Sequence, residues 1–170
     1  MMAMDYQIRP MTREDTATIL DMMRTFYASP AVLTNGSEAI FEADVAECVG
    51  DSPYAEGYVL EADGGIVGYA MLAKSYSTEY GKRCIWIEDL YLLPDYRGLG
   101  IGSAFFAFVE KRYPDSLLRL EVEEENTRAR HVYEKCGFDV LPYMEMKKKA
   151  NTTKAAVSSE RYRGFLSRAM

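Results

Sequence analysis

The stretch Pro94-Asp95-Tyr96-Arg97-Gly98-Leu99-Gly100-Ile101-Gly102-Ser103 lies between an expected strand and an expected helix. Its three glycines leave backbone N–H groups open to a ligand, because glycine has no side chain to block a close approach. The N-terminus of the following helix adds unpaired N–H groups and the positive end of the helix dipole. Arg97 adds a fixed positive charge. The pattern predicts a pyrophosphate-binding turn, and the alternative is a glycine-rich turn without a ligand.

Two familiar phosphate-binding motifs do not fit this turn. A P-loop ends in Gly-Lys-Ser or Gly-Lys-Thr, whereas Gly102 is followed directly by Ser103. The dinucleotide fingerprint requires a glycine five places after the first one, and that position is Ser103. The fingerprint also requires a preceding βαβ unit, which the chain does not show. Both motifs therefore fail on spacing.

Working outward from the turn, the hydrophobic periodicity predicts strands at 6–9, 58–62, 66–72, 84–92, 117–122, 140–141 and 143–146. It predicts four helices, which begin after Thr12, after Ser37, at Ile101 and at Thr127. The turn Asp63-Gly64-Gly65 joins two of the strands as a hairpin. The order β-α-α-β-β-β-α-β-α-β-β indicates a single α/β or α+β domain with a mixed sheet.

Two spaced motifs give a family resemblance. The pattern Arg-x-x-Gly-x-Gly, formed by Arg97, Gly100 and Gly102, resembles the coenzyme A loop of the GNAT superfamily of N-acetyltransferases. The residues Asn126, Ala129, Tyr133 and Gly137-Phe138 resemble the next motif of that family. The resemblance covers roughly residues 6–147. It implies a GNAT acetyltransferase domain over residues 1–149, with a mixed, mostly antiparallel sheet of about six to seven strands and about four helices. Residues 150–170 are then a basic C-terminal extension.

The strand before the turn narrows the resemblance. Ile87-Glu88-Asp89-Leu90-Tyr91-Leu92 and the loop after it look like the spermidine/spermine (diamine) N-acetyltransferase branch. This likeness implies an enzyme that takes acetyl-CoA as cosubstrate and transfers acetyl directly to a primary amine in a ternary complex. The narrower expectation for the acceptor is a polyamine or another small cationic amine.

The resemblance also implies the coenzyme-binding residues. Backbone groups of three strand residues would pair with the pantetheine arm, namely Leu90, Tyr91 and Leu92. Backbone amides of the turn would hold the pyrophosphate, namely those of Arg97, Gly98, Leu99, Gly100, Ile101, Gly102 and Ser103. Asn126 and Tyr133 would approach the coenzyme near its thioester.

The acceptor must lose a proton before it can attack. An alkylamine has a pKa of about 10.4 and arrives as a cation, so a carboxylate can both bind it and accept the proton. Glu88 and Asp89 are the candidates. Because adjacent strand residues point to opposite faces, they cannot play equal roles on one surface. The likeness favours Glu88 as the base and Asp89 as a positioning residue, and the alternative is that each pairs with a lysine or arginine.

Tyr133 is the expected general acid for the leaving thiolate, and a core aromatic is the alternative because it shares a helical stripe with Val132 and Cys136. A backbone N–H from 90–92 could stabilise the oxyanion. No base accompanies Cys136, so a covalent route is not expected. The aromatic candidates for the acceptor pocket are Tyr27, Tyr76, Tyr80 and Trp86, each with simple packing as the alternative.

Composition limits the partners. The net charge is −6, and the segment from Lys147 onward holds seven basic residues against one acidic residue, so residues 1–146 are strongly acidic. This balance disfavours nucleic acid and favours cationic ligands. Three spaced cysteines and one histidine predict neither a disulfide framework nor a metal site. The absence of a signal-like or bilayer-spanning segment favours a cytoplasmic protein without membrane partners.

Other functions remain open at this point. A protein lysine or N-terminal acetyltransferase would share both motifs. So would a non-catalytic acyl-CoA-binding module, and the basic tail could serve an interaction protein. Because the family often dimerises, a homodimer is among the expectations.

Overall fold

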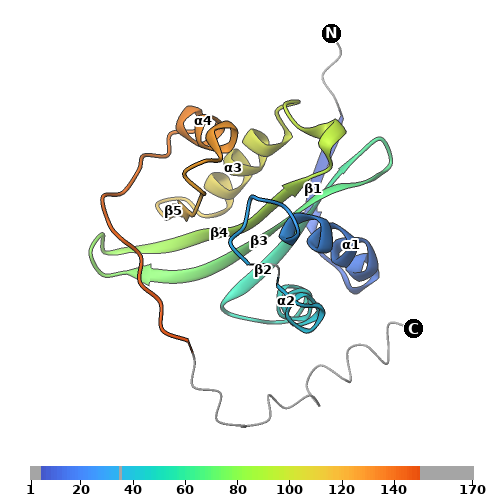
Figure 1. Cartoon of the computed structure of the whole chain (residues 1–170), viewed down its shortest axis with the longest axis horizontal. Helices are drawn as coiled ribbons and strands as arrows, with labels where there is room; N and C mark the ends of the chain where they lie inside the picture. The colour runs from blue at the N-terminus through green and yellow to red at the C-terminus, as the bar shows by residue number, and fades with distance from the viewer. Residues whose placement is uncertain (1–4, 35, 150–170) are drawn as a thin grey trace.

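The computed structural model describes residues 5–34 and 36–149. Figure 1 shows the elements, which follow the chain as β1 (Tyr6–Pro10), α1 (Thr16–Tyr27), α2 (Glu38–Val49), β2 (Ala55–Ala62), β3 (Gly65–Ser77), β4 (Lys82–Leu92), α3 (Ile101–Arg112), β5 (Leu117–Leu120) and α4 (Thr127–Lys135). Single 3-10 turns precede α1 and follow β4, at Arg13–Asp15 and Pro94–Tyr96. The basic extension predicted at 150–170 lies outside the described residues.

The described strands form one five-stranded sheet in the order β1-β2-β3-β4-β5. The first three pairings are antiparallel and the pairing of β4 with β5 is parallel. The predicted hairpin turn lies between β2 and β3, where Asp63 and Gly64 adopt positive φ angles of 51° and 78°. The predicted α/β class with a mixed, mostly antiparallel sheet is confirmed, as are its four helices.

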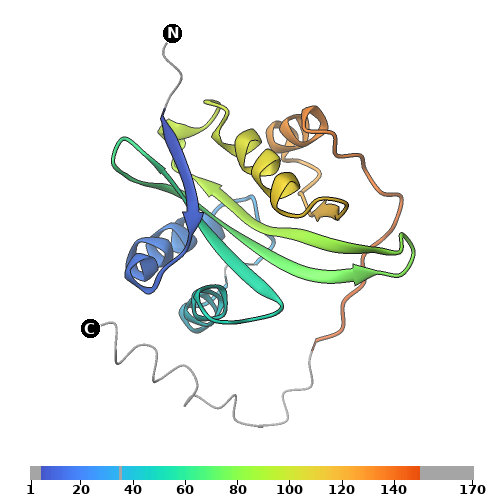
Figure 2. The same ribbon diagram turned by 180° about the vertical axis from the view of Figure 1, so that it is seen from behind.

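Each face of the sheet buries its own apolar cluster. On one face, β-strand residues such as Leu60, Leu72 and Ile85 pack against Phe105 and neighbouring residues of α3. On the other face, Val59, Tyr69 and Met71 pack against α1 and α2. Alternate residues of one strand thus enter different clusters, as the two-residue strand period requires. Figures 1 and 2 show α3 and α4 on one side of the sheet and α1 and α2 on the other.

The predicted strands at 140–141 and 143–146 are wrong, so five described strands replace the expected six to seven. Pro142 separates the two segments and lacks the N–H that a ladder position needs. Their apolar side chains are not buried, since Val140 is 76% exposed and Met144 is 89% exposed. The segment instead contacts the β3–β4 turn, where the Tyr143 hydroxyl donates to Glu79 at 2.8 Å.

No helix in the described ranges is long and apolar enough to cross a membrane.

Candidate active site

The glycine turn adopts a backbone conformation that side chains disfavour. Gly98 has a φ of 79° and Gly100, the residue before α3, has a φ of 86°. An L-residue there would place its Cβ against the backbone, at a cost of about 1–2 kcal/mol. A Cβ at Gly100 would otherwise meet open space. Glycine is therefore needed at this position for its backbone geometry, and the turn stays open on its outer side.

The turn presents unpaired amides at the start of α3. The first bond of the helix runs from the Ala104 N–H to the Gly100 carbonyl, at 2.9 Å. The amides of Ile101, Gly102 and Ser103 precede that bond, so they have no acceptor within the helix. Such amides at the positive end of a helix suit an anion. The structure thus places the predicted turn residues where a pyrophosphate could bind.

Two cations lie at this turn. Arg97 donates from Nε to the Leu92 carbonyl at 2.8 Å, and its guanidinium carbon lies 5.5 Å from the Tyr91 ring centroid. These contacts fix the charge at the end of β4. Arg128 of α4 comes close on the other side, since its Nη2 would lie 3.6 Å from a Cβ at Gly98. The sequence reading missed Arg128, whose spacing from the turn carries no local signal.

The second half of β4 has an open edge. Its pairing with β5 begins at Cys84 and ends at Ile87 opposite Leu120, although β4 continues to Leu92. The segment 88–92 therefore has no strand neighbour on the β5 side among the described residues. An extended ligand that carries amide groups can pair with backbone there, as an added strand does. Together with the turn, this edge fits a ligand with a pyrophosphate and an amide-bearing arm, as in coenzyme A.

The second motif lies on α4. The Asn126 side chain caps this helix by accepting from the Ala129 amide at 3.2 Å. Tyr133 is half-buried and packs edge to face on Phe106, with ring centroids 5.7 Å apart. Burial raises the pKa of its hydroxyl, which keeps the phenol protonated at neutral pH. Among the described residues this hydroxyl has no hydrogen-bond partner. The packing on Phe106 agrees with a core aromatic, and the unpaired, protonated hydroxyl agrees with a general acid.

A bulge in β4 brings the two predicted carboxylates to the same face. The register of β3 with β4 pairs Met71 with Asp89 and Leu72 with Ile87, so Glu88 is the extra residue. Before the bulge, Ile85 and Ile87 face α3; after it, Leu90 and Leu92 do. The phase of the strand therefore changes at Glu88, and Glu88 and Asp89 both line one pocket. The expected separation onto opposite faces is wrong, because it assumed unbroken alternation.

Asp89 is buried and held by two tyrosines. Its side chain is only 4% exposed. The Tyr27 hydroxyl donates to its Oδ1 at 3.0 Å, and the Tyr69 hydroxyl donates to its Oδ2 at 2.8 Å. Burial raises the pKa of Asp89, and the two hydroxyl donors oppose that rise by stabilising the carboxylate. Asp89 is therefore a fixed group rather than a mobile one.

The pocket has a volume of about 260 Å³ and lies between α2 and the sheet. It is lined by Tyr27, Asp44, Glu47, Cys48, Ala55, Met71, Leu72, Ala73, Glu88 and Asp89. Four of these residues are carboxylates, and none is a lysine or arginine. Neither Glu88 nor Asp89 forms an ion pair with any residue that the structure describes, so the ion-pair alternative for these two residues finds no support.

The carboxylates disfavour one another's charge. Burial, together with the charges of Asp89 and Glu88, raises the pKa of Asp44 to about 6. Burial also raises the pKa of Glu88, with contributions from Asp89 and Glu145. Glu121, just beyond β5, has its pKa raised to about 7, first by Glu145. The negative potential thus extends from the pocket to the C-terminal segment.

The sequence reading missed Asp44 and Glu47. Among the aromatic candidates, Tyr27 lines the pocket, whereas Tyr76, Tyr80 and Trp86 do not. Tyr76 and Tyr80 are exposed, and Trp86 stacks with Arg119 at 4.5 Å. The spacing of Asp44, Glu47 and Cys48 places them on one face of α2. This spacing was the signal in the sequence from which Asp44 and Glu47 could have been predicted to share a site. In the described part of the chain, no group of His, Cys, Asp or Glu is arranged to hold a metal ion.

Comparison with known proteins gives consistent matches in sequence. Residues 20–138 match the model of the acetyltransferase (GNAT) family. The thialysine N-epsilon-acetyltransferase of Bos taurus is 34% identical over 149 residues, which cover 81% of this chain and 86% of the relative. The corresponding protein of Mus musculus is 30% identical over 150 residues, which cover 82% and 87% of the two chains.

Solved structures share the fold. A possible acetyltransferase from Clostridium difficile 630 aligns with a TM-score of 0.72 at 19% identity, over 85% of this chain and 97% of the other. The structure of AAC(6')-Iy in complex with the bisubstrate analog CoA-S-monomethyl-acetylneamine aligns with a TM-score of 0.69 at 18% identity, over 86% and 99% of the two chains.

Proposed function

Because the chain belongs to the GNAT family and is an acetyl-CoA-dependent N-acetyltransferase, we propose that its acceptor is a small amine with at least two positive charges, of the thialysine or polyamine kind. The relatives named thialysine N-epsilon-acetyltransferases support this class. The observation that carries the proposal is the pocket beside Glu88, where four carboxylates meet without a lysine or arginine.

The charge of the pocket favours cations over neutral acceptors. Several carboxylates in a partly buried space raise one another's pKa, and a bound cation removes that penalty. The volume of about 260 Å³ is slightly below the usual range of small-molecule pockets, which suits a slender amine chain. The charge and the volume of the pocket both favour a slender amine with several positive charges.

Glu88 is the proposed base. Its raised pKa brings it closer to neutrality, where proton transfer from an ammonium is more effective. Asp89 is the proposed positioning group, since two tyrosine hydroxyls already hold both of its oxygens. This division keeps a fixed negative charge beside a carboxylate that can exchange its proton.

The coenzyme supplies the thioester, and the residues of this chain would bind and orient it. The open edge at Leu90, Tyr91 and Leu92 would pair with the pantetheine arm. The amides of 97–103 would hold the pyrophosphate, with Arg97 and Arg128 beside it. Asn126 would lie near the thioester at the start of α4. Tyr133, with its protonated hydroxyl, would hold the proton that the leaving sulfur needs.

A substrate panel tests the proposal. Thiol release from acetyl-CoA is measured with spermidine, diaminopentane, thialysine, butylamine, and a basic peptide. We expect kcat/KM for the amines with two or more cationic groups to exceed that for butylamine by at least about tenfold, because the second cation meets a second carboxylate. Turnover of the peptide alone would instead support a protein acetyltransferase. Tight coenzyme binding without turnover on any amine would support a binding module.

A variant tests the base. Glu88→Gln should lower kcat by about 10²–10⁴-fold while coenzyme affinity stays the same. Its control, Glu134→Gln, removes an exposed carboxylate from α4 and should leave kcat unchanged. If both variants kept full activity on every amine, Glu88 would have no role in proton transfer.

A further inference from the structure

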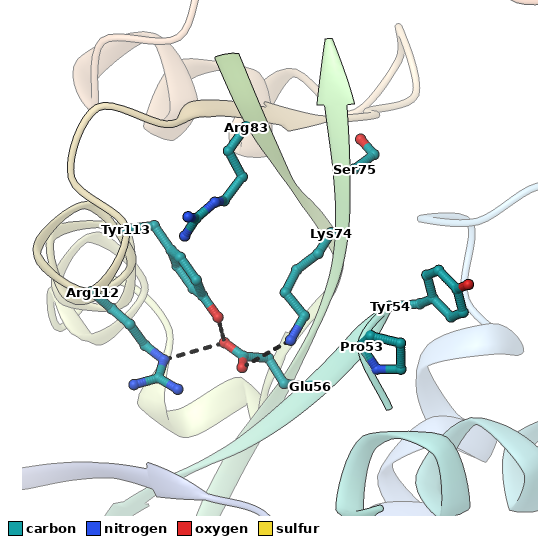
Figure 3. Close-up of a pocket in the computed structure, with 8 residues that line it drawn as sticks. All are labelled: Pro53, Tyr54, Glu56, Lys74, Ser75, Arg83, Arg112 and Tyr113. Carbon is teal, nitrogen blue, oxygen red and sulfur yellow. Dashed lines mark hydrogen bonds and ion pairs between the residues drawn. The ribbon is translucent and has the colours of Figure 1, made fainter. Parts of the chain in front are cut away.

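A second cavity lies on the opposite face of the sheet, at the C-terminal end of α3 (Figure 3). Its volume is about 470 Å³, and it is lined by Pro53, Tyr54, Glu56, Lys74, Ser75, Arg83, Arg112 and Tyr113. The glycine turn lies at the other end of α3, which has 12 residues and is about 18 Å long. This cavity is therefore separate from the coenzyme turn.

The cavity is also separate from the acidic pocket, although both use the same two strands. Ala55 and Ala73 line the acidic pocket, and their neighbours Glu56 and Lys74 line the second cavity. Adjacent residues of a strand point to opposite faces, so the two cavities lie back to back across β2 and β3.

Three cations and one carboxylate meet in the second cavity. Glu56 accepts from the Tyr58 hydroxyl at 2.8 Å, from the Tyr113 hydroxyl, and from Arg112 Nε at 3.3 Å. Lys74 Nζ lies 3.5 Å from the other oxygen of Glu56. Burial alone would raise the pKa of Glu56, but the hydrogen bonds from Tyr113, Arg112 and Tyr58 lower it overall, so the carboxylate stays charged. One negative charge is thus matched against Lys74, Arg83 and Arg112.

Arg83 is not needed to neutralise Glu56. In the described part of the chain it forms no ion pair. Its guanidinium carbon lies 6.0 Å from the Tyr113 ring centroid, and that of Arg112 lies 5.5 Å from the same ring. Figure 3 shows the Arg83 side chain directed toward Tyr113, on the side of the cavity where Arg112 and Glu56 lie. An arginine held on an aromatic ring keeps its planar donors available for an oxyanion.

We propose that this cavity binds a phosphate dianion, either inorganic phosphate or a small phosphate monoester, between Arg83, Lys74 and Arg112. The excess of two positive charges suits the dianion, to which a phosphate monoester is mostly ionised at pH 7, with a charge of about −1.5 to −2. Guanidinium groups bind phosphate oxygens through paired, charge-assisted hydrogen bonds. Tyr54, which is 71% exposed, and Pro53 form the opposite wall and leave room for the organic part of a monoester.

The test is calorimetric titration of the enzyme already saturated with coenzyme A, at constant ionic strength set by chloride. Bound coenzyme A occupies the glycine turn, so any phosphate binding that is measured occurs elsewhere. We expect saturable binding of inorganic phosphate that Arg83→Ala weakens by at least about tenfold. Lys111→Ala removes a neighbouring cation of α3 that does not line the cavity, and it should change nothing.

Two further arms sharpen the test. Glu56→Gln removes the competing negative charge and should tighten phosphate binding several-fold, which a failure to fold cannot imitate. Adenosine monophosphate replaces phosphate in a parallel titration: tighter binding identifies a monoester as the ligand, and binding of phosphate alone identifies the inorganic ion. The proposal is overturned if no saturable binding remains under coenzyme A saturation. It is also overturned if Arg83→Ala binds phosphate as well as the parent does. Neither result bears on amine acetylation.

Discussion

Replacing Asp44 by asparagine should make the protein more stable and a poorer enzyme. Asp44 lies on α2 and faces the acidic pocket, close enough to Asp89 and Glu88 for their charges to disfavour its own. The substitution keeps the size and polarity of the side chain while it removes one charge. Any gain in stability therefore measures the cost of burying this charge together with its repulsion from Asp89 and Glu88.

The size of the effect follows from the pKa. The pKa of Asp44 is raised from its ordinary value of 3.8 to about 6. Each unit corresponds to about 1.4 kcal/mol, so the charged carboxylate costs the folded state up to about 3 kcal/mol. Asparagine still has to be partly buried, which reduces the expected gain to about 1–2 kcal/mol. For a chain of this length, the melting temperature should rise by roughly 3–6 °C.

The stabilisation expected from Asp44→Asn depends on pH, because the charge of Asp44 does. Above pH 6, Asp44 is charged in both folded and unfolded states, so the full penalty is present. Between pH 6 and about 4, the folded state holds a proton that the unfolded state has lost, so the penalty shrinks as the pH falls. Below about pH 4 both states are protonated and the penalty is gone. Asp44→Asn should thus be stabilising at pH 8 and close to neutral near pH 4.

Urea unfolding of parent and variant at pH 8, 6 and 4.5 measures this difference, and Glu42→Gln on the same helix is the control because Glu42 does not line the pocket. Steady-state kinetics with a diamine measures the cost to function. We expect KM to rise about tenfold, since a cation loses one carboxylate partner. A variant that is less stable at pH 8, or equally stabilised at pH 8 and 4.5, would refute the electrostatic reasoning.

Three further changes follow from the geometry. Tyr133→Phe should lower kcat by about 10²-fold or more with coenzyme affinity unchanged, and an unaltered kcat would leave Tyr133 as a packing residue. Gly100→Ala, at a φ of 86°, should destabilise the fold by about 1 kcal/mol and weaken acetyl-CoA binding in a fluorescence titration; a variant with parental affinity would show that the turn tolerates a side chain. Tyr69→Phe removes a donor from buried Asp89 and should cost about 1–3 kcal/mol in urea unfolding, whereas exposed Tyr76→Phe should cost nothing. A neutral Tyr69→Phe would mean that another donor replaces the hydroxyl.

The local features of the glycine turn were predictable because they depend on neighbouring residues. Gly100 ends the turn at a positive φ, and the Ala104 N–H donates the first hydrogen bond of α3 to the Gly100 carbonyl. The glycines of the sequence predict both the turn and the start of the helix. The N-caps at Ser37 and Asn126 likewise depend on side chains that bond within three residues. Such signals lie entirely within a short segment, so the sequence alone carries them.

The bulge at Glu88 could not be predicted in that way. No glycine or proline marks it, although the adjacent acids Glu88 and Asp89 interrupt the apolar alternation of the strand. It arises from the pairing of β4 with β3, which shifts between Met71 and Leu72. The shared face of Glu88 and Asp89 is therefore a property of two strands together. Asp44 was missed for a related reason, since its position depends on how α2 docks on the sheet.

The predicted strands after α4 failed for the opposite reason. The apolar residues at 140–141 and 143–146 are typical of short strands, yet a strand also needs a partner and a face to bury. Among the described residues, no strand pairs with this segment and its methionines stay exposed. The residue pattern shows that a segment is able to form a strand, whereas its pairing with another strand depends on the rest of the fold.

The acidic pocket is costly, and its cost is an argument about function. Asp44, Glu88 and Asp89 each have a raised pKa, so each charge is disfavoured where it lies. A lysine or arginine in the pocket wall would relieve all three, and the lining contains neither. On the other face of the same strands, Lys74 and Arg112 neutralise Glu56, so the fold can pair carboxylates with cations when stability alone is at stake. A cation from outside would restore the balance in the acidic pocket, and the proposed amine acceptor would arrive in that charged form.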